Sequence, residues 1–235
     1  HHQEKLVQLY QESGQEEKYI RASLQLAQCL IERDLIGRAE EVYRQLCSLP
    51  RWDREEAIAP DQGSPSFLEV TQPLLELCRD KGAPQEAASL LDDLAGRYHR
   101  SGKLKEATGQ LEQILQLLPD RPETLERLGQ LHLEAGDTQA ALARMKQLAS
   151  VLEQRGYLRR CAEVVLKIIE NHPSDEDSLV SIQRLSSALG HPRQIPATLQ
   201  EVFGKSVDAK RSEETRAIGD TLLALEPHND PVRMM

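Results

Sequence analysis

The chain has 235 residues, of which 39% are apolar, 29% charged and only 3% aromatic, and its formal net charge is −9 at pH 7. A chain so rich in Leu and Ala is not disordered. Its acidic balance argues against nucleic acid as a partner, because phosphate binding needs a surplus of Lys and Arg. The sequence has no apolar run near the roughly 18 residues that can cross a bilayer, so we expect no membrane insertion.

The first helices are expected in residues 1–51, an N-terminal helical block. Apolar residues at helical spacing begin at Leu6, and Gly14 ends this stretch. A longer stretch with the same spacing follows from Leu26 and stops at Pro50. Because glycine and proline both end helices, we expect one helix that ends at Gly14, followed by one helical repeat that ends at Pro50.

A connecting loop is expected in residues 52–67, where the helical spacing stops. Pro60, Gly63 and Pro65 stand there among mixed charges, which is typical of a loop that joins two helical blocks. The only tryptophan, Trp52, lies in this segment. We expect Trp52 to pin the loop onto a helix, and the alternative is an exposed anchor for a partner.

A 54-residue repeat organises the chain from residue 68 to residue 229. Glycines and prolines recur at this interval: Gly82, Gly136 and Gly190, then Gly102 and Gly156, and Pro119, Pro173 and Pro227. Glycine adopts a left-handed helix-ending conformation at little cost, and proline cannot continue a helix. The spacing predicts three units of three helices each, 68–121, 122–175 and 176–229, and a tail of residues 230–235.

The middle helix of the second unit, expected over 139–155, is apolar nearly all round. A helix buried on two sides has this pattern, so we expect it to pack against both neighbours. In the third unit Pro192 and Pro196 interrupt the pattern. We therefore expect irregular final helices there, in a terminal capping role.

These features resemble the tetratricopeptide repeat (TPR), a family of helix pairs that repeats roughly every 34 residues. Its signature places in one copy between 88 and 121 are filled by Leu91, Leu94, Ala95, Tyr98, Gly102, Ala107, Leu111, Ile114 and Pro119. Two further copies begin at Pro122 and Leu142, and the three-helix spacing is similar to bacterial TPR proteins. The resemblance implies an all-α fold, a TPR-like right-handed α-solenoid of helix-turn-helix repeats.

The function that the resemblance implies is a cytoplasmic scaffold or adaptor that binds a partner protein or peptide on the superhelical surface. Two alternatives stay open: a structural scaffold that self-assembles end to end into a homo-oligomer, and an accessory domain of a larger regulatory protein. We expect no enzyme, no cofactor and no metal site, because the histidines do not gather and no CxxC motif occurs. The four separate cysteines are typical of core residues in a reducing compartment.

Partner binding in this family takes place on an inner surface lined by the first helix of each pair. Transfer of the family's inner positions to this chain gives five candidate carboxylates, Glu69, Glu76, Asp92, Glu123 and Glu126. Their negative charge predicts a basic or mixed-charge partner segment. The alternative is that these side chains only solvate their helices.

Overall fold

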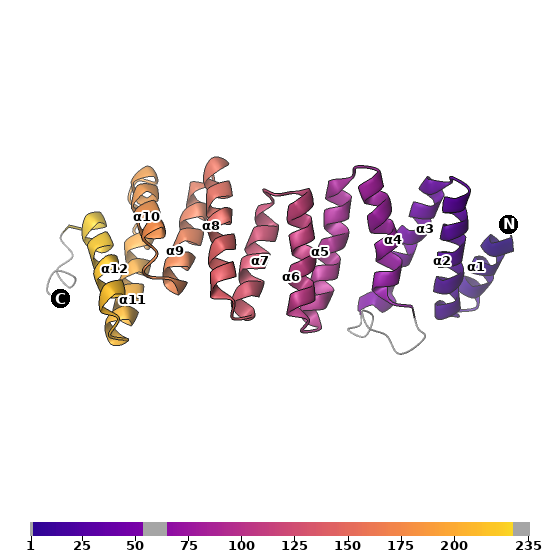
Figure 1. Ribbon diagram of the computed structural model, residues 1–235, viewed down its shortest axis with the longest axis horizontal. Coiled ribbons are helices and arrows are strands. Elements are labelled where there is room, and N and C mark those ends of the chain that lie inside the picture. The colour runs from indigo at the N-terminus through magenta and orange to yellow at the C-terminus, as the bar shows by residue number, and fades with distance from the viewer. Residues whose placement is uncertain (1, 54–64, 228–235) are drawn as a thin grey trace. The chain divides into compact units, whose positions relative to one another are not determined.

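The computed structural model describes residues 2–53 and 65–227, and every regular element in them is helical (Figure 1). These residues form twelve α-helices and one 3-10 helix, and the described part of the chain has no strand. The chain divides into two compact units, residues 1–119 and 120–235. The predicted all-α fold is confirmed.

Unit 1 contains six α-helices, each of which packs against the next along the chain. Their bounds are α1 His2–Glu12, α2 Glu16–Glu32, α3 Ile36–Cys47, α4 Phe67–Asp80, α5 Pro84–Arg100 and α6 Leu104–Leu117, with the 3-10 helix η1 at Pro50–Asp53. Turns of three residues join α1 to α2, α2 to α3, α4 to α5 and α5 to α6. Such short turns hold consecutive helices side by side.

Unit 2 contains the other six α-helices. Their bounds are α7 Pro122–Glu134, α8 Thr138–Gln154, α9 Leu158–Asn171, α10 Glu176–Ala188, α11 Gln194–Asp208 and α12 Ser212–Leu225. From α7 to α10 each helix packs against the next. The prediction that the middle helix, α8, is buried on two sides is confirmed, because it packs against both α7 and α9 and buries Ala141, Met145 and Leu152.

The predicted helix ends at Gly136 and Gly156 are confirmed. Both residues have a φ of 76°, a left-handed conformation that a glycine adopts without strain. The third helix of each predicted unit begins at Leu104, Leu158 or Ser212, which keeps the 54-residue step. That the three segments superpose as equivalent units stays a prediction. Residues 54–64 of the predicted loop, and the whole predicted tail, lie outside the described residues.

The expected irregularity of the last unit is confirmed at α11. This helix begins at Gln194, two residues later than a 54-residue step from the start of α8. Pro192 disfavours helical backbone in the residue before it, and that residue, His191, has a φ of 57°. Pro196 is buried in the first turn of α11, where its missing amide hydrogen is not needed. Around this helix the packing is also less regular: α10 packs on α12 as well as on α9, and α11 packs on α9 and α12.

Trp52 is fully buried in η1, as the first interpretation expected, and the alternative of an exposed anchor is wrong. Its indole Nε1 donates a hydrogen bond of 2.6 Å to the carbonyl of Leu46. Its ring lies 5.6 Å from the ring of Phe67, the first residue of α4. The guanidinium of Arg97 lies 4.1 Å from the centre of the Phe67 ring and donates to the carbonyl of Trp52. Trp52 therefore joins η1 to α3, α4 and α5.

Replacement of Ala141 by leucine is expected to lower the free energy of unfolding by about 1–3 kcal/mol, because it overpacks the contact between α7 and α8. Ala141 is fully buried, and its carbonyl oxygen lies only 4.0 Å from the place where a Cβ on Gly129 would stand. Ala143 on the same helix is exposed and supplies the control. Urea denaturation measures the free energy of unfolding of the Ala141→Leu and Ala143→Leu proteins. Equal stability of the two variants would show that Ala141 does not lie in the contact between α7 and α8.

Candidate partner-binding surfaces

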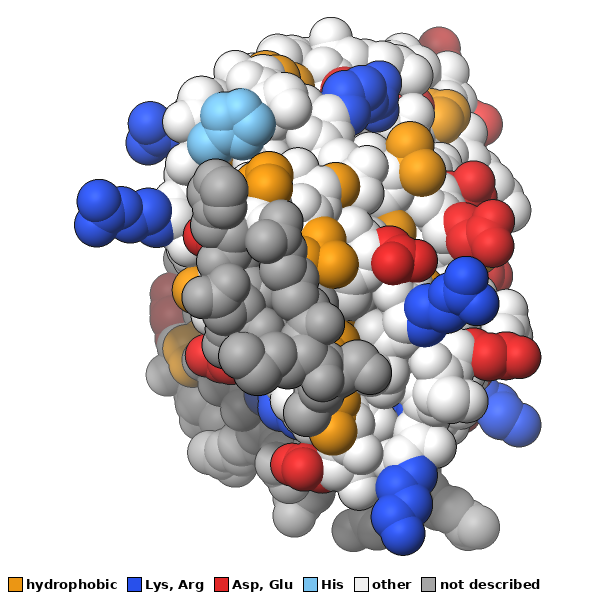
Figure 2. Space-filling view, turned by 90° about the vertical axis from the view of Figure 1, so that its left-hand side faces the viewer, with side chains coloured by type: hydrophobic (Ala, Val, Ile, Leu, Met, Phe, Trp, Pro, Cys, Tyr) orange, Lys and Arg blue, Asp and Glu red, His pale blue; other side chains and the backbone are white. Residues whose placement is uncertain are grey.

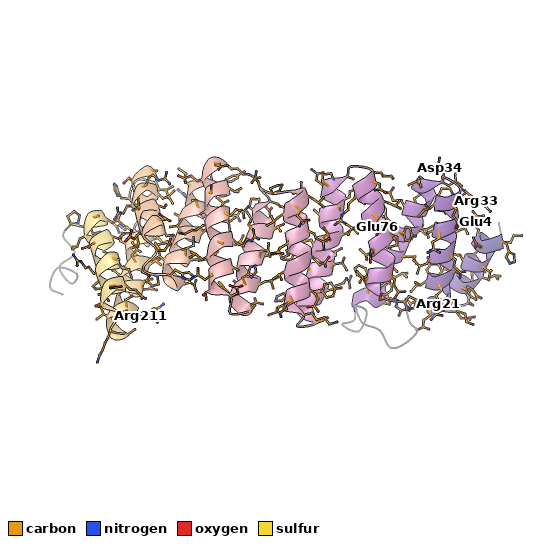
Figure 3. The ribbon with its side chains drawn as sticks, in the orientation of Figure 1. Glu4, Arg21, Arg33, Asp34, Glu76 and Arg211 are labelled. Atoms are coloured by element: carbon orange, nitrogen blue, oxygen red, sulfur yellow. The ribbon has the colours of Figure 1, made fainter. Side chains whose placement is uncertain are left out.

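The exposed face of α4 carries two of the predicted carboxylates. Glu69, Gln72, Glu76 and Arg79 are all exposed, and their spacing places them on one side of the helix. Glu76 is labelled on α4 in Figure 3. Burial raises the pKa of the Tyr43 phenol on α3, and the negative charge of Glu76 raises it further. This exposed face of α4, named here the α4 stripe, is therefore acidic where it approaches α3.

Glu69 also has a local structural role that the family positions did not indicate. Ser66 caps α4: its hydroxyl accepts a hydrogen bond of 3.2 Å from the amide of Glu69 and donates one of 3.0 Å to the Glu69 carboxylate. A serine followed three residues later by glutamate is the signature of a capping box, and this signal could have been found in the sequence. Glu69 therefore stabilises the start of α4 whether or not it meets a partner.

The predicted residue on α5 differs in its setting from its neighbour. Asp92 is half-buried, whereas Asp93 is exposed and lines a hollow between α3, α4 and α5. Successive residues of a helix point about 100° apart, so a transfer of family positions that is off by one residue selects a different side of the helix. Asp93 is the carboxylate of this pair that faces open space.

The two remaining carboxylates, Glu123 and Glu126, lie on α7 in unit 2, and both are exposed. The carboxylate of Glu126 lies 3.2 Å from the guanidinium of Arg160 on α9. Both partners are about half exposed, at 49% and 51%, so the ion pair contributes little to stability. The structure thus leaves Glu123 as the α7 carboxylate with no ion pair among the described residues, while Glu126 is engaged with α9.

The hollow in unit 1, named here the α3–α5 hollow, has a volume of about 350 Å³. Leu74 and Cys78 of α4 form its apolar part, Arg44 and Cys47 of α3 one side, and Ser89 and Asp93 of α5 the other. A groove of this kind can hold one apolar side chain of a bound segment between polar walls.

A charged cluster lies where α3 meets α4 and α5. Arg44 approaches Glu40 at 2.6 Å and Glu86 at 2.5 Å, and Lys81 also pairs with Glu40. Hydrogen bonds from Lys81 and Arg44 hold the pKa of the Glu40 carboxyl below its ordinary value. These residues were not among the sequence candidates, because the ion pairs depend on which helices are neighbours.

The cysteines near this cluster are not activated nucleophiles. Burial raises the pKa of the Cys47 thiol to about 11, and burial together with the charge of Glu86 raises the pKa of Cys78. At neutral pH both thiols are therefore protonated, and a thiol reacts as its thiolate.

The described residues contain no cluster of three His, Cys, Asp or Glu side chains that could hold a metal ion. In residues 2–53 and 65–227 no helix has the length and apolarity needed to span a bilayer.

A second hollow, in unit 2, has a volume of about 690 Å³ and lies against α11 and α12. Phe203, Val207 and Leu223 supply apolar surface, and Arg216 and Asp220 supply charge. Figure 2 faces this end of the chain and shows hydrophobic side chains on it, with separate Lys, Arg, Asp and Glu side chains around them. This α11–α12 hollow was missed by the sequence analysis, which considered only inner helix positions.

Several polar contacts between helices share one interval along the chain. Three of them join residues 34 apart: Glu4 with Arg38 at 2.7 Å, Arg79 with Gln113 at 2.8 Å, and Glu126 with Arg160 at 3.2 Å. Each lies within one unit and bridges two helices that have a third between them in the chain. The interval is the one at which helix pairs of the TPR family recur.

Comparison with known proteins points to the same family. Residues 98–159 match the family model described as tetratricopeptide repeat. No curated protein matches the sequence. Among solved structures, the chain is similar to BtubC (BKLC) from P. vanneervenii, with 15% identity, a TM-score of 0.47, and coverage of 97% of this chain and 92% of that one.

Two further solved structures carry repeats in their descriptions. A tetratricopeptide repeat protein from Parabacteroides merdae ATCC 43184 shares 14% identity at a TM-score of 0.27, with coverage of 92% of this chain and 96% of that one. TPR-like repeats of a putative kinesin light chain from Podosopora anserina share 21% identity at a TM-score of 0.27, with coverage of 82% and 96%. The match across residues 98–159, together with the packing of α5 on α6, of α7 on α8 and of α8 on α9, identifies tetratricopeptide repeats in this part of the chain.

Proposed function

We propose that the chain is an adaptor that holds a basic or mixed-charge segment of a partner protein on the exposed face of its repeats. Helical repeats of this family form interaction scaffolds in general, because stacked helices offer an extended surface without a deep pocket. The observation that carries the proposal is the α4 stripe, where Glu69 and Glu76 are exposed on one side of α4. A cytoplasmic location stays a prediction from the sequence.

The charge of the chain supports a cationic partner segment. The net charge of the chain is −9, and Glu76 and Glu123 are exposed on α4 and α7. Exposed ion pairs contribute about 0.2–1 kcal/mol each, so charge alone gives weak binding. The α3–α5 hollow, with Leu74 and Cys78 in it, supplies the apolar contact that a specific complex also needs.

The proposal is tested by capture of proteins from an extract of the source cells on two immobilised variants. The first reverses Glu76 and Glu123 to lysine. The control reverses Glu32 and Glu170, which are exposed on α2 and α9, and changes the net charge equally. We expect wild type and control to retain the same protein, identified by mass spectrometry, and the first variant to lose it. Equal retention by all three would contradict binding at these carboxylates.

A further inference from the structure

The α-helices of the described residues occur in the triplets α1–α3, α4–α6, α7–α9 and α10–α12. The turns between the helices show which residue of one triplet corresponds to which residue of another. A left-handed residue follows each first helix at Gly14, Gly82, Gly136 and Gly190, and another precedes each third helix at Asp34, Gly102, Gly156 and Lys210. The step from Asp34 to Lys210 relates α3 to α12, so Arg44 of α3 corresponds to Asp220 of α12. The step from Gly14 to Gly82 relates α1–α2 to α4–α5, so Lys18 corresponds to Glu86.

One side of the third helix is covered where another triplet follows in the same unit. In unit 1 α4 packs against this side of α3, and Tyr43 there is only 1% exposed. In unit 2 α10 and α11 pack against α9, where Leu166 is 7% and Ile169 is 0% exposed. In both places the covering element begins with the first helix of the next triplet.

The corresponding side of α12 borders the α11–α12 hollow. The counterparts of Tyr43 and Arg44 there are Gly219 and Asp220, and both line the hollow; Gly219 is buried and Asp220 is exposed. Among the described residues no helix follows α12 to cover them. The face combines the apolar surface of Phe203 and Leu223 with exposed charge, so it suits a polar-edged helical hairpin.

The other half of such a junction lies on α1 and α2. No residue of α1 is buried, and Leu9 is 61% exposed. Its counterparts in the later first helices, Leu77, Leu131 and Leu185, are 9%, 3% and 2% exposed. Leu6 is the counterpart of Leu74, which lines the α3–α5 hollow. The first hairpin thus presents surface that its counterparts bury.

The charges at these two faces also correspond. Within unit 1 Arg44 of α3 lies 2.5 Å from Glu86 of α5. The counterpart residues are Asp220 on α12 and Lys18 on α2, both of them exposed. Asp220 is negative where Arg44 is positive, and Lys18 is positive where Glu86 is negative. The two charges therefore still attract each other if α2 of one copy approaches α12 of another copy in the way that α5 approaches α3. Arg21, labelled on α2 in Figure 3, follows Lys18 on the same side and corresponds to Ser89 of the α3–α5 hollow.

We propose that α1–α2 of one copy docks on α12 of a second copy, as α4–α5 docks on α3 within unit 1, with Lys18 opposite the second copy's Asp220. The contact joins different surfaces of the two copies, so it is a head-to-tail contact that builds chains or rings rather than a two-fold dimer. It goes beyond the proposed adaptor function, because it needs no other protein and does not use Glu76 or Glu123.

The test is a concentration series in sedimentation velocity with the 235-residue chain, in which the wild type should form species larger than a monomer as concentration rises. Asp220→Lys and Lys18→Glu should each weaken association by about tenfold, because each places like charges opposite one another. The protein that carries both changes should associate again, and so should a mixture of the two single variants. Glu201→Lys, at an exposed position of α11, is the control and should associate like the wild type.

Restored association in the doubly changed protein identifies the pair, since a general loss of fold would not be rescued by a second charge reversal. Far-UV circular dichroism of each variant checks that the helices are intact. A wild-type chain that stays monomeric at all concentrations overturns the proposal. Association that both single variants leave unchanged also overturns it, and would place the self-contact elsewhere.

Discussion

Replacement of Trp52 by alanine is expected to lower the free energy of unfolding of unit 1 by about 3–5 kcal/mol, the usual cost of truncating a buried large aromatic side chain. Trp52 is fully buried, contacts Phe67 and donates to the carbonyl of Leu46. Its loss leaves a cavity between η1, α3 and α4 and removes one of the two hydrogen bonds that the Leu46 carbonyl accepts, the other coming from the amide of Leu49. Urea denaturation followed by far-UV circular dichroism measures the effect.

The control for this change is Trp52→Phe, which keeps an aromatic ring against Phe67 and removes the N–H donor. We expect it to lose less stability than the alanine variant, because most of the apolar contact remains. If Trp52→Ala were as stable as the wild type, η1 would not be held to the helices by this side chain.

Replacement of Leu128 by alanine is expected to lower the free energy of unfolding of unit 2 by about 2–5 kcal/mol. Leu128 is fully buried on α7, the helix that packs against α8. Gln130 on the same helix is exposed, so Gln130→Ala should change stability by less than about 0.5 kcal/mol. Native-state hydrogen exchange locates the loss, since neighbouring repeats stabilise one another and protection should fall first in α7 and α8. A loss of protection confined to α5 and α6 would contradict the assignment of Leu128 to the unit 2 core.

Most of the helical order could be predicted from the sequence because the signals are local. Gly136 and Gly156 end helices through their own backbone conformation, so these helix ends can be predicted without knowledge of any tertiary contact. The delayed start of α11 follows in the same way from Pro192. The burial of Trp52 was also expected, but its partners were not, since Phe67 and Arg97 lie far from it in sequence.

The candidate sites depend on information that a single helix does not contain. Asp92 and Asp93 differ by one residue, and only the rotation of α5 against α3 and α4 decides which one lines the hollow. Glu126 is a family position, yet its pairing with Arg160 becomes predictable only when the 34-residue interval is applied to charged residues. The side of α12 that borders the α11–α12 hollow could be identified only by comparison of its residues with those that α3 and α9 bury.

The most direct measurement of the adaptor function is the affinity of the captured partner protein for wild type and for the Glu76→Lys, Glu123→Lys protein at low and high salt. We predict that the reversed protein binds much more weakly at low salt and that the difference shrinks as salt rises, because the Debye length falls from about 30 Å at 0.01 M to about 8 Å at 0.15 M. Unchanged affinity of the reversed protein at low salt would contradict the account and place the partner away from these carboxylates.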